Sequence, residues 1–309
     1  MVAEKNSMVG KKGEEEEYVI VKRKTEVCYY VMKLAEYGEL YSFIEHTDRF
    51  NEDMTRYILD QLVDGMRYLH SHGIVHRDIK PENLLINKKG RIIIADFSFA
   101  TRMNEVESDE LFQKRYDPFI ERRTDVGSEI FNAPEIWDNE INLHELEEQM
   151  IKAQGEDKIF DYSEIDGKLR KLSVFPKYNG EKADVFSIGA SLFMIQMKSP
   201  PFRKAVQTDP YFKRLCSVKK QNYWKIFKSL PHSDEFKDLM EKTLMKYPSQ
   251  RYSLDQIRGS KFFDVSDDAA QSHHSQVYSP ESFIEEIKKR FDIVESVKQN
   301  DLSNKTNHE

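Results

Sequence analysis

One stretch of the sequence is apolar on almost every side when it is drawn as a helix. It reads DVFSIGASLFMIQM and covers residues 184–197. A helix without a polar face is stable only where other elements surround it on all sides. We therefore expect a helix at the centre of a domain that is large enough to enclose it.

A second helix is predicted from Asn51, because apolar residues recur every three or four positions as far as Leu69. Short β-like runs follow at GIVH, NLLI and RIIIAD, and further helical segments extend to about Phe263. Near the N-terminus, the runs YVIV and VCYYVM flank a charged turn, KRKTE. The pattern predicts an α+β fold in which helices dominate.

The two ends of the chain differ from this central part. Residues 1–17 are polar and charged without periodicity, which predicts a disordered arm. Residues 266–309 are expected to hold a linker and a C-terminal helix, with Ser279 as its cap and Pro280 at its first position. The apolar face of that helix comprises Phe283, Ile287, Phe291 and Val294. We expect it to pack on the domain.

Charge and composition exclude several classes of protein. The chain has 47 basic and 54 acidic residues, a net charge of −7, so neither nucleic acid nor an anionic membrane is expected as a partner. It has no run of 18 apolar residues and no apolar signal core. Cys28 and Cys216 lack paired spacing, as in a reducing compartment. We expect a soluble, cytoplasmic protein.

The chemistry is concentrated in HRDIKPENLL, residues 76–85. Asp78 and Asn83 are five residues apart, and the run IIIADFS places Asp96 18 residues after Asp78. Residues 133–135 read APE, and KADVFSIG opens the apolar helix. These motifs, in this order and spacing, resemble the eukaryotic protein kinases of the serine/threonine type.

The resemblance covers residues 18 to about 265 and implies a kinase-like fold with a mainly helical larger lobe over residues 36–265. It also implies ATP and Mg²⁺ as cofactors and protein hydroxyl groups as substrates. Asp78 would orient the substrate hydroxyl, and Lys80 would place a positive charge on the transferred phosphoryl group. Asn83 and Asp96 would hold the magnesium ion.

The resemblance also suggests where ATP and the substrate bind. VMKLAEYGEL is similar to the segment that grips adenine, which makes Met32 the gatekeeper, Ala35 the backbone contact and Leu85 the floor of the pocket. Glu39 falls where kinases bind ribose or a basic substrate residue. Glu82 adds a second carboxylate, which favours substrates with basic residues near the phosphorylated position. Glu39 and Glu82 could equally be plain solvated carboxylates.

Regulation is expected in the segment that precedes the APE motif. Thr124 lies where many kinases are phosphorylated, and a phosphate there would pair with Arg77. Ser128 would lie near the catalytic residues. The resemblance further implies a buried ion pair between Glu135 and Arg251, and an Asp184 carboxylate that accepts backbone N–H groups of the catalytic loop.

The smaller lobe of the family is expected to be incomplete in this chain. The lysine of VIVK, Lys22, precedes Asp78 by only 56 residues, whereas the family's phosphate lysine precedes the catalytic aspartate by about ninety. We therefore interpret VIVK as the family's fourth strand, with Lys22 at its solvent end, and residues 18–35 as a remnant of that lobe. There is no G-x-G-x-x-G, and GKKG is a weak match. We expect an N-terminally incomplete kinase with severely impaired activity.

Two further departures distinguish the chain from the family pattern. Ser98 replaces the glycine that follows Asp96 and Phe97, which predicts a more restricted loop. An insertion at about 139–178 has a predicted helix near 143–150, and its DYSEIDGKL lacks the oxygen ligands that calcium requires.

The alternative to an active kinase is a pseudokinase, a scaffold without phosphotransfer activity. The missing lysine and glycine loop favour it, and the retained Asp78, Lys80, Asn83 and Asp96 argue against it.

Overall fold

The structure is a computed structural model that describes residues 2–9, 19–26, 29, 31–106, 115–117, 119–121, 129–137, 177–263 and 279–306. The chain forms two compact units, Met1–Leu34 and Ala35–Glu309, here called the small unit and the large unit. Several sequence predictions lie outside the described residues: Cys28, Thr124, Ser128, the helix near 143–150, the loop at 161–169 and most of the linker.

A β-hairpin makes up most of the described part of the small unit. β1 (Val2–Val9) pairs antiparallel with β2 (Val19–Glu26), with Val2 opposite Glu26 and Val9 opposite Val19. Residues 2–9 therefore differ from the disordered arm predicted over residues 1–17. Strands pair through backbone hydrogen bonds, which do not require apolar side chains at regular spacing. The disordered arm was predicted only because such regular apolar spacing is missing from residues 1–17.

The expected boundaries of the remnant strands also differ. β2 continues through the KRKTE segment, where a turn is predicted, so Lys22 lies within the strand rather than at its end. The described residues of the second run, Tyr29, Val31 and Met32, are in no strand. Two paired strands alone are only marginally stable in water.

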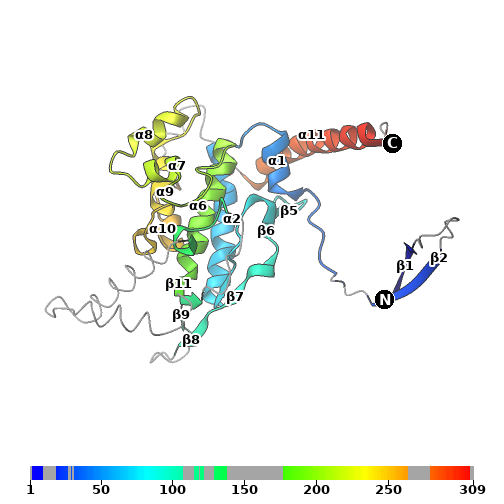
Figure 1. Ribbon diagram of the computed structural model, residues 1–309. Helices are drawn as coiled ribbons and strands as arrows, with labels where there is room; N and C mark the ends of the chain where they lie inside the picture. Colours follow the sequence, from blue (N-terminus) through cyan, green and yellow to red (C-terminus); the bar gives the residue numbers. More distant parts are fainter. Residues whose placement is uncertain are drawn as a thin grey trace. The chain divides into compact units, whose positions relative to one another are not determined.

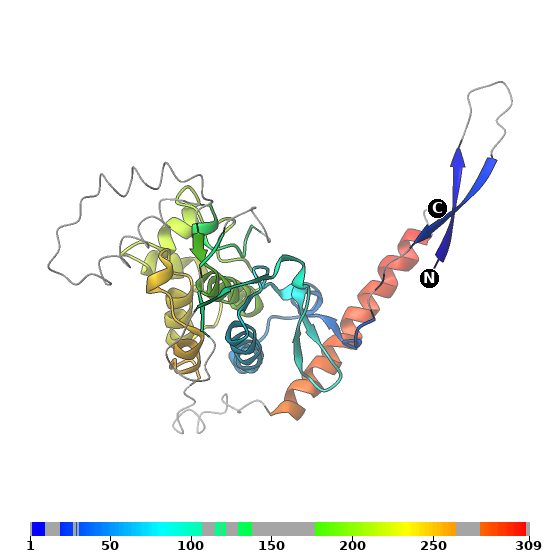
Figure 2. The same ribbon diagram turned by 90° about the horizontal axis from the view of Figure 1, so that it is seen from below.

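The large unit is organised around α6 (Gly180–Met197), the predicted central helix. The side chain of Asn179 caps it by accepting a hydrogen bond from the backbone N–H of Lys182, at 3.0 Å. Every residue from Ala183 to Met197 is buried, which confirms the prediction of an enclosed helix. Figures 1 and 2 show α6 in the interior of the unit.

The predicted amphipathic helix is α2 (Glu52–Ser71), and it packs against α6. Asn51 caps it, with its side-chain oxygen 2.9 Å from the backbone nitrogen of Met54. Its buried face includes Met54, Ile58, Leu62 and Met66. The three- to four-residue apolar period therefore marks the side of α2 that faces the core.

The other described helices lie around these two. They are α1 (Leu40–His46), α3 (Pro134–Trp137), α7 (Pro210–Leu215), α8 (Gln221–Trp224), α9 (Asp234–Thr243), α10 (Leu254–Arg258) and α11 (Pro280–Thr306), with the 3-10 turns η1 (Pro81–Asn83), η2 (Phe97–Phe99), η3 (Lys225–Phe227) and η4 (Pro248–Gln250). In both views α7 to α10 gather on one side of α6, and α1 and α11 lie on the other. No helix in the described part of the chain is long and apolar enough to cross a bilayer.

Short antiparallel strands fix the loops beside α2 and α6. β3 (Gly38–Glu39), β5 (Leu84–Ile86) and β6 (Ile92–Ile94) form one sheet in that order; the two-stranded pairs are β4 (Ile74–Val75) with β7 (Thr101–Arg102), β8 (Asn104–Val106) with β9 (Arg115–Asp117), and β10 (Phe119–Glu121) with β11 (Lys177–Asn179). The strands predicted in GIVH, NLLI and RIIIAD are confirmed as β4, β5 and β6.

The C-terminal helix α11 packs on the large unit against α1, as predicted. Phe283, Ile287 and Val294 are almost fully buried. Arg290 donates from Nη1 to the hydroxyl of Thr47 at 2.8 Å and also to the backbone oxygen of Asp48. The helix is therefore held by both apolar contacts and a buried cation.

Gly90 permits the close approach of α11 to the turn between β5 and β6. Its φ is +68°, and a Cβ atom at this position would lie 2.8 Å from the side chain of Ile284 and 3.2 Å from that of Phe283. A side chain at position 90 would be strained at this φ and would force the Ile284 side chain to shift. The docking of α11 therefore depends on the glycine of this turn as well as on the residues of the helix.

We predict that Ile287→Ala releases α11 from the large unit, because the Ile287 side chain is fully buried. A buried Ile→Ala change costs about 2–5 kcal/mol. Hydrogen exchange over residues 280–306 should accelerate strongly, while exchange in α6 stays slow. Lys289→Ala, at an exposed position of the same helix, is the control. Equal exchange in the two variants would contradict this packing.

Candidate active site

The catalytic-loop segment that follows β4 is attached to the central helix through Asp184. The two carboxylate oxygens of Asp184 accept the backbone N–H groups of His76, at 2.9 Å, and Arg77, at 2.8 Å. His70, from the end of α2, lies 2.8 Å from the same carboxylate through its Nε2. Arg77 has a φ of 67°, a backbone conformation that these hydrogen bonds help to hold.

Asp78, Lys80 and Asn83 are in direct contact. The amide nitrogen of Asn83 donates to the backbone oxygen of Asp78 at 2.8 Å and to its carboxylate at 3.0 Å. Lys80 Nζ lies 2.7 Å from the same carboxylate oxygen. Asp78 and Asn83 are almost fully buried, so these contacts form in a low-dielectric environment where charge interactions are strong.

Asp96 reaches this group through the ladder of β5 and β6. Leu84 pairs with Ile94, and the N–H of Ala95 then donates to the backbone oxygen of Asn83 at 2.9 Å, so the next residue, Asp96, emerges beside Asn83. Its pKa lies below its usual value. The largest causes are hydrogen bonds from the hydroxyl and backbone N–H of Ser98, and the positive charge of Lys80 lowers the pKa further.

These side chains fit a magnesium ion. The amide nitrogen of Asn83 is engaged with Asp78, which leaves the amide oxygen to face a cation, and the exposed Asp96 carboxylate is ionised at neutral pH. Within the ranges that the structure describes, no cluster of three His, Cys, Asp or Glu residues could hold a metal by itself. Mg²⁺ is usually held by one or two carboxylates together with phosphate oxygens and water, so two protein ligands suffice.

Glu82 lies close to Asp78 and Lys80 and has one unsatisfied oxygen. Its Oε2 is buried without a hydrogen-bond partner. Burial raises the pKa of Glu82, and the charges of Asp78 and Glu39 raise it further, against the opposing effect of Lys80. A cationic side chain placed here would satisfy the oxygen and offset the repulsion. The pair Glu39 and Glu82 is therefore suited to a basic group.

The residues predicted to bind adenine are divided between the two units. Leu85 pairs with Glu39 across β3 and β5, and Ala35 is buried at the start of the large unit. Met32 belongs to the small unit, and its side chain is 85% exposed. The structure brings Glu39 and Leu85 together, and the nucleotide-binding roles of all four residues stay predictions.

Arg77 contacts Tyr178, a residue that no sequence motif identified as part of the site. Its Nε donates to the backbone oxygen of Phe99 at 2.6 Å, and its guanidinium also bonds to the hydroxyl of Tyr178. Burial raises the pKa of Tyr178 to about 12, and the Arg77 contact only partly offsets this effect. Tyr178 lies at the end of the insertion and belongs to no motif, so no sequence signal pointed to it.

Glu135 and Arg251 form the buried ion pair that the sequence suggested. Arg251 Nη1 and Nη2 lie 2.7 and 2.5 Å from the two carboxylate oxygens, and both side chains have no exposed surface. Arg251 also donates to the backbone oxygens of Met245, Lys182 and Lys246. This pair links α3 to the segment before α10.

Comparison with known proteins identifies the class. The chain matches the protein kinase domain over residues 17–147 and 174–263, which is more than half of its length. With its catalytic group attached to the central helix as described above, the chain belongs to the protein kinase family.

Similar curated proteins are serine/threonine kinases. The chain is 30% identical over 242 residues to serine/threonine-protein kinase PKH3 of Eremothecium gossypii, covering 78% of this chain and 26% of that protein. It is 27% identical to PKH2 of Candida albicans, covering 77% of this chain and 20% of that one. It is 29% identical to CBL-interacting protein kinase 26 of Oryza sativa, covering 82% of this chain and 42% of that protein. The chain thus spans less than half the length of each of these relatives.

We predict that Glu135→Ala destabilises the large unit by about 3–5 kcal/mol, because it leaves the Arg251 guanidinium buried without its counter-charge. Urea unfolding followed by circular dichroism measures the loss. Glu129→Ala is the matched control: Glu129 is 66% exposed in its ion pair with Lys204, and removing such a pair costs at most about 1 kcal/mol. Similar losses in the two variants would refute the role of burial.

Proposed function

We propose that this protein is a serine/threonine protein kinase that transfers the γ-phosphoryl group of ATP to hydroxyl groups of protein substrates, with Mg²⁺ as the metal. The main support is the contact group of Asp78, Lys80 and Asn83, attached through Asp184 to the central helix. Membership of the protein kinase family and similarity to serine/threonine kinases agree with it.

Each residue has a role that follows from its chemistry. Asp78 orients the substrate hydroxyl and takes its proton as the oxygen attacks the γ-phosphorus and the bond to the bridging oxygen of ADP breaks. Lys80 neutralises charge on the transferred group. Asn83 and Asp96 would hold the magnesium ion, which would supply positive charge to neutralise the phosphates. Because the transition state is loose, positioning and charge neutralisation provide most of the catalysis.

The adenine and ribose of ATP are proposed to contact Met32, Ala35, Glu39 and Leu85. Leu85 and Glu39 are paired across two strands, which supports a shared surface for them. Ser98 adds a feature of its own, because its backbone N–H donates to Asp96 at 3.2 Å and its hydroxyl also bonds to that carboxylate. We propose that Ser98 helps to orient Asp96 for the metal.

Substrates with basic residues near the phosphorylated position are proposed because of Glu82. Its buried oxygen has no partner, and Glu39 contributes a second negative charge close by. Control by phosphorylation of Thr124, with Arg77 as the partner of the phosphate, remains a proposal, as does the position of Ser128 near Asp78. Arg77 already contacts Phe99 and Tyr178, so a phosphate would have to join or replace these contacts.

We predict that Asp78→Asn lowers phosphotransfer to a serine peptide by about 10²–10⁴-fold, the usual contribution of a general base. The assay uses the 309-residue protein with labelled ATP and Mg²⁺, followed by phosphoamino-acid analysis. Asp238→Asn, at an exposed site on α9, is the control. If the unmodified protein transfers no phosphate, or if Asp78→Asn retains full activity, the proposed function is wrong and the scaffold alternative gains support.

A further inference from the structure

A cavity of about 780 Å³ lies among α8, η3 and the start of α9, and none of its lining residues belongs to the proposed active site. Phe193 of α6 packs against the Trp224 ring that lines the cavity, with ring centroids 6.2 Å apart. Ser191, two residues earlier on the same helix, contacts the catalytic loop instead, because its hydroxyl donates to the backbone oxygen of Ile79 at 3.2 Å. At 3.6 residues per turn these two side chains leave the helix on roughly opposite sides, so the cavity and the loop lie on different faces of α6.

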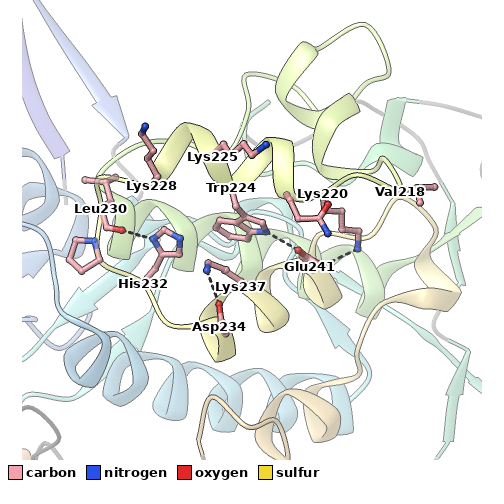
Figure 3. A pocket seen from close by; sticks show the side chains of 12 residues that line it. Val218, Lys220, Trp224, Lys225, Lys228, Leu230, His232, Asp234, Lys237 and Glu241 are labelled. Atoms are coloured by element: carbon pink, nitrogen blue, oxygen red, sulfur yellow. Dashed lines mark hydrogen bonds and ion pairs between the residues drawn. The ribbon is translucent and has the colours of Figure 1, made fainter. Parts of the chain in front are cut away.

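The floor of the cavity is an aromatic surface held in a fixed orientation. Figure 3 shows the Trp224 indole between His232 and Glu241. Its Nε1 donates to Glu241 at 2.8 Å, and its ring lies 5.4 Å from the ring of His232. Leu230 and the fully exposed Val218 add apolar surface at the edge. Trp224 is itself only 8% exposed, so the edge of its ring, together with Leu230 and Val218, is the apolar surface offered to a side chain of a partner.

The charges around the cavity do not cancel. Its two carboxylates are already paired: Glu241 lies 3.3 Å from Lys220, and Asp234 lies 2.7 Å from Lys237. Lys225 and Lys228 also line it and are exposed, and neither has a carboxylate within ion-pair distance in the part of the chain that the structure describes.

The local sequence has the same excess of positive charge. Residues 218–228 contain Lys219, Lys220, Lys225 and Lys228 and no acidic residue, although the whole chain has a net charge of −7. This local charge favours an anionic occupant.

We propose that this cavity docks an acidic peptide segment of a protein substrate, with carboxylates on Lys225 and Lys228 and an apolar side chain against Trp224. The proposal rests on the proposed kinase function. Glu39 and Glu82 repel acidic residues from the catalytic group, so a substrate would present basic residues there and an acidic segment at the cavity. Two separate sites of opposite charge would fix the orientation of the substrate.

The direct test measures binding without phosphotransfer. The probe is a fluorescein-labelled peptide of alternating Glu and Asp around one Leu, and anisotropy reports its binding to the full chain. We expect K225E/K228E to weaken binding at least tenfold, and 0.5 M salt to weaken it as well. K288E/K289E makes the same charge change at exposed positions of α11 and should leave binding unchanged.

Tryptophan fluorescence locates the bound peptide. The chain has two tryptophans, so in a Trp137→Phe background Trp224 is the sole tryptophan, and its emission is read by exciting tryptophan selectively over tyrosine. The acidic peptide should shift its emission, and a peptide with Gln in place of each acidic residue should not. Equal binding of the Gln peptide, an equal effect of K288E/K289E, or tighter binding of single-stranded RNA or anionic vesicles would overturn the proposal.

Kinetics then connect docking to turnover. For a serine substrate fused to the acidic segment, K225E/K228E should raise KM at least fivefold with kcat unchanged, and a short serine peptide without the segment should be unaffected. An unchanged KM would refute docking while phosphotransfer persists. Conversely, loss of all transfer with intact peptide binding would refute the kinase function and leave the docking surface standing, so the two failures are distinguishable.

Discussion

The Asp184 carboxylate holds three parts of the large unit together. It accepts backbone N–H groups from His76 and Arg77 and contacts His70 at the end of α2. Because Asp184 is fully buried in a helix that is itself enclosed, this anchor has little freedom to move. The catalytic loop therefore takes its position from the core, and a buried carboxylate left without these donors would be costly.

The site follows from this anchor through short backbone ladders. β5 carries the chain away from Asn83, and β6 returns it to Asp96, so that the two proposed metal ligands lie at the two ends of one hairpin. The turn of the same hairpin, at Gly90, receives α11. The proposed ligands and the C-terminal helix therefore contact one small structural element.

Charge divides the large unit into surfaces of different character. Glu39 and Glu82 place negative charge beside Lys80, whereas Lys225 and Lys228 leave a positive rim around Trp224. Neither surface follows from the net charge of −7, which is an average over the whole chain. The two surfaces lie on different faces of the buried helix, since Ser191 contacts the loop that carries Glu82 and Phe193 packs against Trp224.

The sequence predicted the parts of the fold that have a strong period or motif. The enclosed helix α6, the amphipathic α2 and the contact group of Asp78 and Asn83 could be found because each position is set by local spacing. The start of β2 was also predicted, from its apolar run, but β1 and its pairing with β2 could not be, because β1 has no apolar period. Tyr178 was missed for a related reason: its contact with Arg77 joins positions a hundred residues apart.

The central claim is that Asn83 and Asp96 hold one divalent cation beside the Asp78 carboxylate. Anomalous diffraction from crystals grown with Mn²⁺ and a non-hydrolysable ATP analogue tests it most directly. The account predicts a manganese peak at a bonding distance of about 2.0–2.3 Å from the side-chain oxygens of both Asn83 and Asp96. Manganese bound elsewhere, with these two side chains turned away from it, would contradict the account.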